Sequence, residues 1–482
     1  MTSPAPGALP AQGVPLCVDL DGTLVKSDML MESLVAVLRR SPWLEFALPW
    51  WLARGRAVLK RELADRAEID VSVLPYDENV LAMLRRERAA GRTLVLATAS
   101  DEGIAKRIAA HLGLFDAVIA SDGRTNLKRE AKARALVARY GEAGFDYVGE
   151  DRHDLPVWQH ARAAYVVGSN AAIGAHLAQL GKPVHEISRA PRGIRALMKG
   201  VRAYHWAKNL LVFVPLLTAH VYLDAPSAAA SVLAFIAFSL VASSVYLAND
   251  LVDLQDDRRH PTKRARPIAS GELPIAAALA LVPVLLAAAA AVAALLPWGF
   301  GALLLAYVAT NLAYSLALKR AALIDVFVLA GLYTLRILAG AAAIEVPVSH
   351  WLLAFSLFAF LSLALAKRYV EVANVASRDE ERVGGRGYLA SDGALLGMLG
   401  TASGYLSVLV FALYITSPQV VMLYSSPSVL WFAVPLLLYW ISRVWFLAER
   451  GVLHEDPLLF ALHDPPSYAT GALILALMVA AT

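Results

Sequence analysis

The sequence has a single cysteine, Cys17, among its 482 residues. No disulfide bond can form within the chain, which excludes the disulfide-rich folds of small secreted proteins. The first residues also lack the basic segment and the apolar core of a secretory signal. We therefore expect residues 1–13 to be a short disordered tail and the domain that follows to remain in the cytoplasm.

The chain also has little net charge. It carries 44 basic and 40 acidic residues, a formal charge of +4 at pH 7. Proteins that bind nucleic acids usually have a larger and more clustered basic excess, so we expect no nucleic-acid partner. Hydrophobic residues, by contrast, make up 58% of the chain, and the mean hydropathy is +0.54. Residues 1–200 are typical of a soluble α/β domain, whereas apolar runs long enough to cross a bilayer dominate from about residue 205.

Nine of these runs are candidate membrane spans. They lie at 207–223, 229–248, 275–295, 298–317, 322–343, 350–368, 394–416, 428–447 and 466–482. An eight- or ten-span count is the alternative. The loops alternate between a charged set (249–274, 318–321, 369–393 and 448–466) and a set without Lys or Arg (224–228, 296–297, 344–349 and 417–427). The positive-inside rule predicts a multi-pass protein of the inner membrane, with the charged loops in the cytoplasm.

The most polar stretch follows the second candidate span. Asp250, Asp253 and Asp257 are spaced i, i+3 and i+7, so all three carboxylates share one face of a helix. Such carboxylates repel one another unless a hard cation lies between them, and Mg²⁺ commonly links carboxylates to substrate phosphates. Three cations follow and could bind the same phosphates: Lys263, Arg264 and Arg266. The alternative is a solvated loop, although acids beside a membrane are costly to keep without a use.

Other ionisable side chains lie near the cytoplasmic ends of the spans. They are Lys208, Tyr314, Lys319, Arg320, Asp325, Lys367, Arg368, Glu371, Arg378, Arg382, Arg386 and Tyr388. We expect them to face the aspartate-rich loop across one cavity, with membrane anchoring as the alternative for Lys319 and Arg320. Arg336 lies about three helical turns beyond Asp325, where a charge needs a partner or a polar cavity. In the last cytoplasmic loop, His454, Glu455 and Asp456 form either a lid or a solvated turn.

The first 200 residues contain a series of short motifs after apolar, strand-like runs. Asp19 and Asp21 follow the run that begins at Leu16, and two hydroxyls, Thr98 and Ser100, end a second run. Two lysines, Lys128 and Lys132, lie on a predicted helix. A third apolar run ends in acids: Glu150, Asp151 and Asp154. The carboxyl ends of parallel strands are where α/β sheets bind ligands. Carboxylates two residues apart on a strand share a face, so one can attack while the other transfers a proton.

In this order the motifs resemble the haloacid dehalogenase superfamily of phosphatases, over residues 14–185 with a helical cap at about 28–90. The resemblance implies a Rossmann-like fold in which Asp19 is the nucleophile and Asp21 the general acid and base. Thr98 would hold the phosphoryl group (alternative Ser100), Lys132 would steady its charge (alternative Lys128), and Asp19, Glu150 and Asp154 would bind Mg²⁺. The family usually has Asp where this chain has Glu150, and Asp151 is the alternative ligand. A decayed, regulatory domain is the other interpretation.

The polar stretch has a resemblance of its own. The pattern Asn-Asp-x-x-Asp-x-x-x-Asp, followed by His-Pro-Thr-Lys-Arg at 260–264, resembles the first aspartate motif of the UbiA superfamily, over about residues 201–482. The most similar members are the decaprenyl-phosphate phosphoribosyltransferases. They share Arg-x-x-x-Trp-x-Lys-Asn at 202–209 and Lys-Arg-Tyr-x-Glu at 367–371. The resemblance implies that Asn249, Asp250, Asp253 and Asp257 hold Mg²⁺ and a diphosphate.

One departure from the family bears on the substrate. Quinone- and haem-type members carry a second acidic motif, whereas here Asp325 stands alone, with Leu329 where its partner acid would fall. This favours transfer of phosphoribose from phosphoribosyl diphosphate to a polyprenyl phosphate. The acceptor phosphate would lie among Lys208, Lys319, Lys367 and Arg368. Prenyl transfer to an aromatic acceptor is the alternative, and a polytopic transporter or sensor is the alternative of another class.

The two halves are joined by an Arg-rich segment at 186–200, which we expect to be a linker at the anionic membrane surface. An aromatic stretch at 41–56 within the cap belongs either to the cap core or to the membrane interface. The fusion suggests that the phosphatase removes the 5-phosphate of a lipid-linked phosphoribose made by the membrane domain.

Overall fold

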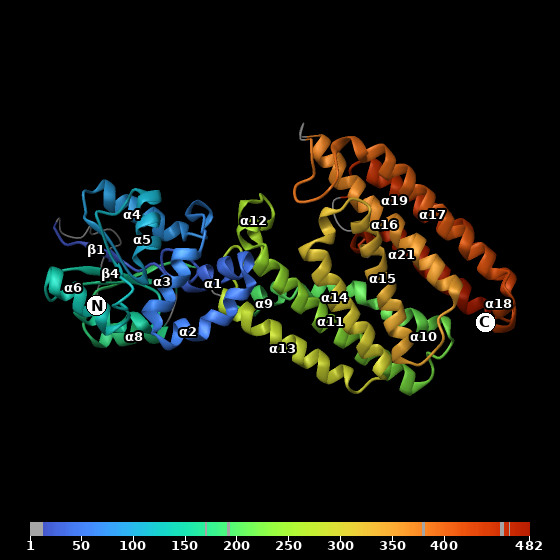
Figure 1. Cartoon of the computed structure of the whole chain (residues 1–482), viewed down its shortest axis with the longest axis horizontal. Coiled ribbons are helices and arrows are strands. Elements are labelled where there is room, and N and C mark those ends of the chain that lie inside the picture. Colours follow the sequence, from blue (N-terminus) through green and yellow to red (C-terminus); the bar gives the residue numbers. More distant parts are fainter. Residues whose placement is uncertain (1–12, 169–170, 190–192, 378–380, 454–456, 462) are drawn as a thin grey trace, which may run out of the picture. The chain divides into compact units, whose positions relative to one another are not determined.

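A computed structural model of the chain describes residues 13–168, 171–189, 193–377, 381–453, 457–461 and 463–482 (Figure 1). The predicted tail (1–12) lies outside the described residues, as do Arg378, His454, Glu455 and Asp456. The chain divides into two compact units. The first comprises Met1–Val201 and Tyr246–Leu281, and the second comprises Arg202–Val245 and Val282–Thr482.

A six-stranded parallel sheet forms the centre of the first unit. In chain order the strands are β1 (Leu16–Val18), β2 (Leu94–Asp101), β3 (Ala117–Ser121), β4 (Asp146–Gly149), β5 (Ala164–Val167) and β6 (Val184–Ile187). Their spatial order is β3-β2-β1-β4-β5-β6, and every pairing is parallel. This is the doubly wound order, in which ligands bind beside the first strand where the winding reverses. The prediction of a Rossmann-like α/β domain is confirmed.

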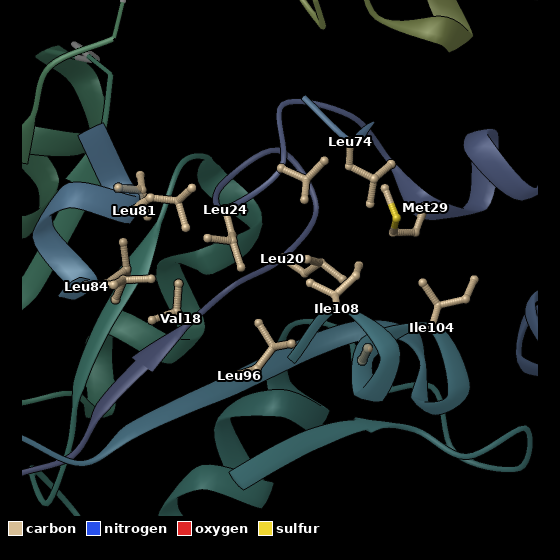
Figure 2. Packing of buried hydrophobic residues seen from close by; sticks show 14 of the residues in the cluster. Val18, Leu20, Leu24, Met29, Leu74, Leu81, Leu84, Leu96, Ile104 and Ile108 are labelled. Atoms are coloured by element: carbon tan, nitrogen blue, oxygen red, sulfur yellow. The ribbon is translucent and has the colours of Figure 1, made fainter. Parts of the chain in front are cut away.

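Both faces of the sheet are buried, because successive side chains of a strand point to opposite faces. Leu16 and Val18 of β1 pack into one hydrophobic cluster, whereas Cys17 between them packs into the other. Figure 2 shows the first cluster, in which Leu20 lies beside Ile108 of helix α5 (Glu102–Leu112). A strand buried on both faces needs a continuous apolar run, which explains the uninterrupted hydrophobic stretches of the sequence.

The helices between β1 and β2 occupy the segment in which a cap was expected. They are α1 (Met29–Arg40), η1 (Pro42–Ala47), α2 (Leu48–Ala53), α3 (Arg56–Arg66), η2 (Val71–Val73) and α4 (Glu78–Ala89). Their aromatic stretch is divided: Trp51 is buried, whereas the side chains of Trp43, Phe46 and Trp50 are largely exposed. The remaining helices of this part are α6 (Glu130–Tyr140), η3 (Arg152–Asp154), α7 (Leu155–His160), α8 (Ala171–Gln179) and α9 (Ile194–Gly200).

Within the described residues, seven helices are long and apolar enough to cross a membrane, so this is a multi-pass membrane protein. Five of them are α11 (Ala225–Val252), α13 (Ile275–Ala293), α14 (Trp298–Leu316), α15 (Ile324–Ala343) and α16 (His350–Ala376). The other two each include the 3-10 helix before them: Ala390–Ile415, with α17 (Gly393–Ile415), and Pro427–Glu449, with α19 (Ala433–Glu449). Shorter elements are α12 (Leu254–Arg259), η5 (Lys263–Ala265), η6 (Leu318–Arg320), η7 (Ala390–Asp392), α18 (Pro418–Leu423), η8 (Pro427–Phe432) and α20 (Pro457–Ala461).

The first and last of the nine expected spans differ from the other seven. The run at 207–223 is divided into a 3-10 helix, η4 (Ala203–Phe213), and a short α-helix, α10 (Val214–Thr218). Pro215 lies in the first turn of α10, where its missing N–H cannot continue the preceding helix. The last run forms α21 (Pro465–Ala481), an apolar helix of 17 residues.

Arg336, whose partner could not be named from the sequence, is enclosed by neutral groups in the core of the second unit. Its guanidinium donates hydrogen bonds to the Asn209 side-chain oxygen (2.9 Å), the Leu332 carbonyl (2.6 Å) and the Tyr307 hydroxyl (2.9 Å). The guanidinium carbon also lies 4.9 Å from the centre of the Tyr307 ring and 5.5 Å from that of Tyr333, within reach of cation–π attraction. Arg336 therefore ties η4 and α14 to α15.

Helix α15 packs against η4 so closely that its residue 340 must be glycine. A Cβ atom at Gly340 would lie 2.0 Å from the Val212 carbonyl oxygen, whereas one at Gly331 of the same helix would meet nothing within 4 Å. We expect Gly340→Ala to lower the free energy of unfolding by about 1–3 kcal/mol, because the backbones must separate. Thermal unfolding in detergent measures this. The control Gly331→Ala should be neutral or slightly stabilising, and equal effects of both variants would contradict the packing argument.

Candidate active sites

A pocket opens at the carboxyl ends of the central strands of the first unit. Its polar lining includes Asp19, Asp21, Lys26, Asp28, Arg56, Lys60, Ser100, Asn126, Lys128, Arg129, Lys132, Glu150, Asp151, His153 and Asp154. Apolar side chains complete the lining: Leu30, Met31, Leu52, Leu59, Pro274, Ile275 and Ala276. Most of the predicted phosphatase residues thus line one pocket, but Thr98 does not, and its alternative Ser100 does. Two further lining residues begin the apolar helix α13, and Pro274 directly precedes it.

Asp19 and Lys132 form the centre of this site. The Lys132 amine lies 2.7 Å from Asp19 Oδ1 and 2.8 Å from the Tyr147 hydroxyl, which donates to Asp154 Oδ1 at 2.9 Å. Burial raises the pKa of Asp19 to about 7; Lys132 opposes the rise, and the carboxylates of Asp154 and Asp21 add to it. Of the two candidate lysines, Lys132 therefore holds the carboxylate, whereas Lys128 lines the same pocket.

Asp21 is held between the strands and the cap. Its Oδ1 accepts the Met29 backbone N–H at 2.8 Å, at the start of α1. Its Oδ2 accepts the Ser100 hydroxyl at 2.5 Å, and the Thr98 hydroxyl lies farther away, at 3.5 Å. Burial, with the nearby charge of Asp28, raises the pKa of Asp21. A raised pKa favours the protonated carboxyl group, which is the form that a general acid needs.

The acids after β4 have different surroundings. Asp154 Oδ2 accepts the backbone N–H groups of Glu150 (3.0 Å) and Asp151 (3.4 Å). The Glu150 carboxylate pairs instead with Arg189 at 2.7 Å. The Glu150 carboxylate also fills the space that a side chain at position 22 would need, because a Cβ at Gly22 would lie 1.7 Å from Glu150 Oε1. Glycine at position 22, with φ +76°, makes room for the longer acid.

Arg189 was not singled out from the sequence. It lies just after β6, in the segment expected to be a linker, and its Nε donates to Asp77 at 2.6 Å. Its other nitrogens reach Glu150 and the carbonyls of Gly22 and Thr23. No local motif marks such a residue, because its partners are 39 to 167 positions away in the chain.

The donor set of this pocket fits Mg²⁺. Among the described residues, no three acid, histidine or cysteine side chains form a ready-made metal cage. Mg²⁺ does not require one, because it binds one or two carboxylates together with waters and substrate phosphates. Burial raises the pKa of Asp19, and the nearby carboxylates of Asp154 and Asp21 add to the rise. A divalent ion near Asp19 and Asp154 would stabilise the ionised carboxylates.

The aspartate-rich motif begins at the end of α11 and continues into α12. Asp253 lies between the two helices, with φ −89° and ψ 9°. Its N–H donates to Asn249 O, and Asp257 N donates to Asp253 O, both at 2.8 Å. The helix is thus interrupted within the motif, so helical spacing does not by itself place the three aspartates on one face. Arg266 joins two of them: its Nη1 lies 3.1 Å from Asp250 Oδ1 and 2.6 Å from Asp257 Oδ2.

This arrangement also fits a divalent ion. Asp250 and Asp257 are buried, Asn249 and Asp253 are half-buried, and Lys263 is exposed, as is Arg264. Burial raises the pKa of Asp257, Arg266 opposes the rise, and the Asp250 carboxylate adds to it. The Asp250 and Asp257 carboxylates already bind one cation, the Arg266 guanidinium, in the motif where the sequence predicts a metal ion.

A second polar cluster lies within the second unit around Asp325, which is completely buried. Arg368 Nε and the Tyr388 hydroxyl both donate to the Asp325 carboxylate, and Arg386 lies 3.7 Å from it. Arg368 also contacts Glu371 and the Tyr314 hydroxyl, the latter at 3.1 Å. The structure therefore brings together six of the ionisable residues that the sequence singles out: Tyr314, Asp325, Arg368, Glu371, Arg386 and Tyr388.

The lysines proposed for the acceptor phosphate have varied surroundings. Lys208 is buried, and its amine lies 5.7 Å from the centre of the Tyr333 ring. Lys319 and Lys367 are half-buried. Lys208 is followed by Asn209, whose amide donates to Ser239 at 3.0 Å and whose oxygen accepts Arg336.

Comparison with known families identifies both parts of the chain. The model of the UbiA prenyltransferase family matches residues 211–479, and that of haloacid dehalogenase-like hydrolases matches residues 16–159. Together with the geometry above, these matches define a polytopic membrane enzyme with an N-terminal phosphatase-type domain. The chain belongs to the UbiA prenyltransferase family.

Individual relatives match the chain to different extents. The uncharacterized protein y4nM of Sinorhizobium fredii is 39% identical over 97% of this chain and 91% of its own length. The decaprenyl-phosphate phosphoribosyltransferase of Mycolicibacterium smegmatis is 32% identical over 56% of this chain and 87% of its own. A UbiA homologue from Archaeoglobus fulgidus, solved with GPP and Mg²⁺, covers 59% of this chain and 99% of its own, with 16% identity and a TM-score of 0.44.

The phosphatase pocket can be tested with a small phosphate ester. Asp19→Asn should abolish phosphate release, since the amide cannot form an aspartyl-phosphate. Asp21→Asn should lower the rate by about 10²–10⁴-fold, the usual contribution of a general acid. Release of inorganic phosphate by the purified full chain measures both. Asp65→Asn, an exposed acid paired with Arg61 on α3, is the matched control, and Asp19→Asn protein that retains full turnover would exclude this nucleophile.

Proposed function

We propose that the membrane domain transfers 5-phosphoribose from phosphoribosyl diphosphate to a polyprenyl phosphate. The phosphatase domain then removes the 5-phosphate from the lipid-linked product. The protein would act in the inner membrane, with both active sites on the cytoplasmic side. The similarity to a decaprenyl-phosphate phosphoribosyltransferase supports this donor and this acceptor.

The observation that carries the proposal is the enclosure of Asp325. A prenyl transferase of the quinone type would use acids at this position to bind a metal, but Asp325 is fully buried and engaged by Arg368 and Tyr388. The cluster contains two arginines, Arg368 and Arg386, and two acids, Asp325 and Glu371. Their charges balance one another. The Asp325 carboxylate thus binds side chains of the protein instead of a metal ion. This suits a site that receives an anionic acceptor.

In the transfer step, an oxygen of the lipid phosphate attacks C1 of the ribose while the bond from C1 to the diphosphate breaks. The diphosphate leaves with the bonding electrons, and the acceptor, already ionised at pH 7, needs no base. Asp250, Asp253 and Asp257 would hold a Mg²⁺ ion that stabilises the departing charge. The chain's own contribution is to align donor and acceptor and to bind the phosphates with Lys263, Arg264 and Arg266.

In the phosphatase step, Asp19 attacks the 5-phosphate and Asp21 gives a proton to the leaving ribose hydroxyl. Water then attacks the aspartyl-phosphate and transfers a proton to Asp21, which releases inorganic phosphate and restores Asp19. The apolar lining of the pocket, to which Pro274 and Ile275 at the beginning of α13 contribute, supports a substrate with a lipid chain. The exposed aromatic side chains of the cap, Trp43 among them, suit a membrane interface.

The donor can be identified by competition. Purified full chain in lipid nanodiscs with a polyprenyl phosphate and Mg²⁺ should form product from phosphoribosyl diphosphate, and chelation should stop the reaction. Asp250→Asn and Asp253→Asn should each lower the rate at least about a hundredfold, since metal stabilisation of the leaving group is worth several kcal/mol. Labelled lipid is the readout.

The control for these variants is Glu272→Gln, an exposed acid in the same segment of the chain. It should leave the rate unchanged. If labelled isoprenyl diphosphate reacts with an aromatic acceptor while phosphoribosyl diphosphate does not react, the enzyme is a prenyl transferase and the proposal is wrong.

A further inference from the structure

A buried ion pair links the phosphatase cap to the helix of the aspartate-rich motif, within the first unit. Glu32, on cap helix α1, accepts two hydrogen bonds from the Arg258 guanidinium on α12, of 2.6 and 2.9 Å. Both side chains are almost completely inaccessible, with 0% and 2% of their surface exposed. The remaining edge of the guanidinium donates from Nε to the Ala269 carbonyl at 3.0 Å. Every edge of this arginine is thus fixed.

Arg258 directly follows Asp257, one of the three carboxylates of the motif. Asp257 is joined through Arg266 to Asp250, and Arg258 is joined to the cap. Successive residues of an α-helix point about 100° apart. The two contacts therefore hold two different faces of α12, and together they set the direction in which the Asp257 carboxylate points.

Further contacts surround this ion pair. Arg39 of α1 pairs with Asp256 at 2.6 Å, and Arg259 pairs with Asp70 at 2.9 Å, both at exposed positions where ion pairs contribute little. A Cβ at Gly271 would lie 2.6 Å from Lys26 Cβ, so the two backbones approach closely. Of these contacts, only Glu32–Arg258 is both charged and buried, among the pairs that the structure describes between the cap and α12.

We propose that Glu32 and Arg258 are positioning residues through which the phosphatase cap holds α12 in the arrangement that binds the metal and diphosphate. A buried ion pair is a weak source of stability, because the charges lose their water, but it is specific in geometry. The phosphatase domain is therefore a structural part of the transferase site, independently of its own chemistry. The inference rests on the proposed function only in assigning metal and diphosphate to the aspartates.

The test is backbone hydrogen exchange of the full chain in nanodiscs at increasing Mg²⁺. In the unaltered protein, Mg²⁺ should protect the amides of residues 246–271. Glu32→Gln keeps the shape but leaves Arg258 buried without a counter-charge. We expect the Mg²⁺ concentration for half-maximal protection to rise about 10–100-fold, as for other residues that orient metal ligands. Glu32→Asp, which keeps the charge, should retain most of the affinity.

The matched control is Glu87→Gln. Glu87 is another buried acid of the first unit and pairs with Arg92 at 3.0 Å. Its loss should reduce thermal stability without shifting the Mg²⁺ dependence of residues 246–271. An unchanged Mg²⁺ dependence in Glu32→Gln, or an equal shift in both variants, would overturn the inference.

This readout does not require turnover, so it separates the inference from the proposed function. If the donor proves to be an isoprenyl diphosphate, the shift in Mg²⁺ dependence still decides the role of Glu32. If Mg²⁺ gives no protection to residues 246–271 in the unaltered protein, both the metal assignment and the inference are wrong.

Discussion

Carboxylates placed where water is scarce must be balanced by cations, and this requirement shapes each polar site of the protein. Asp19 is held by Lys132, Asp250 and Asp257 by Arg266, and Asp325 by Arg368. In each case removing one partner would leave an uncompensated charge in a low-dielectric environment, which is strongly destabilising. The three sites differ in how fully cations balance the charges of their carboxylates. The Asp325 cluster pairs two acids with two arginines. At the other two sites a single cation is shared by two acids: Lys132 by Asp19 and Asp154, and Arg266 by Asp250 and Asp257.

The features that the sequence predicts correctly are those encoded locally. The parallel sheet follows from apolar runs that end in polar residues, and the seven long spans follow from length and composition. Asp250 and Asp257 meet at the Arg266 guanidinium, as their spacing predicts, although the helix is interrupted at Asp253 between them. The division of the first span at Pro215 could have been anticipated from the proline, but its apolar composition dominated the prediction.

Partnerships between distant residues could not be predicted in this way. Glu32 and Arg258 are 226 positions apart, and nothing in the residues around Glu32 distinguishes it from other acids of a cap helix. Arg336 was recognised as a charge needing a partner, yet its partners are an amide, a carbonyl and a tyrosine rather than an acid. Many neutral groups can satisfy an arginine, so the sequence does not indicate which of them the fold brings close.

The contacts of Arg189 have a consequence for how the protein can be divided. This arginine lies beyond the last strand of the sheet, yet it bonds to the loop after Asp19 and to Glu150. A fragment that ended with β6 at Ile187 would keep every strand of the sheet but would lack the guanidinium that pairs with Glu150. The Glu150 carboxylate would then lose a cation that compensates its charge at the pocket that contains Asp19. A fragment that preserves the electrostatic balance of this pocket must therefore extend past the last strand to include Arg189.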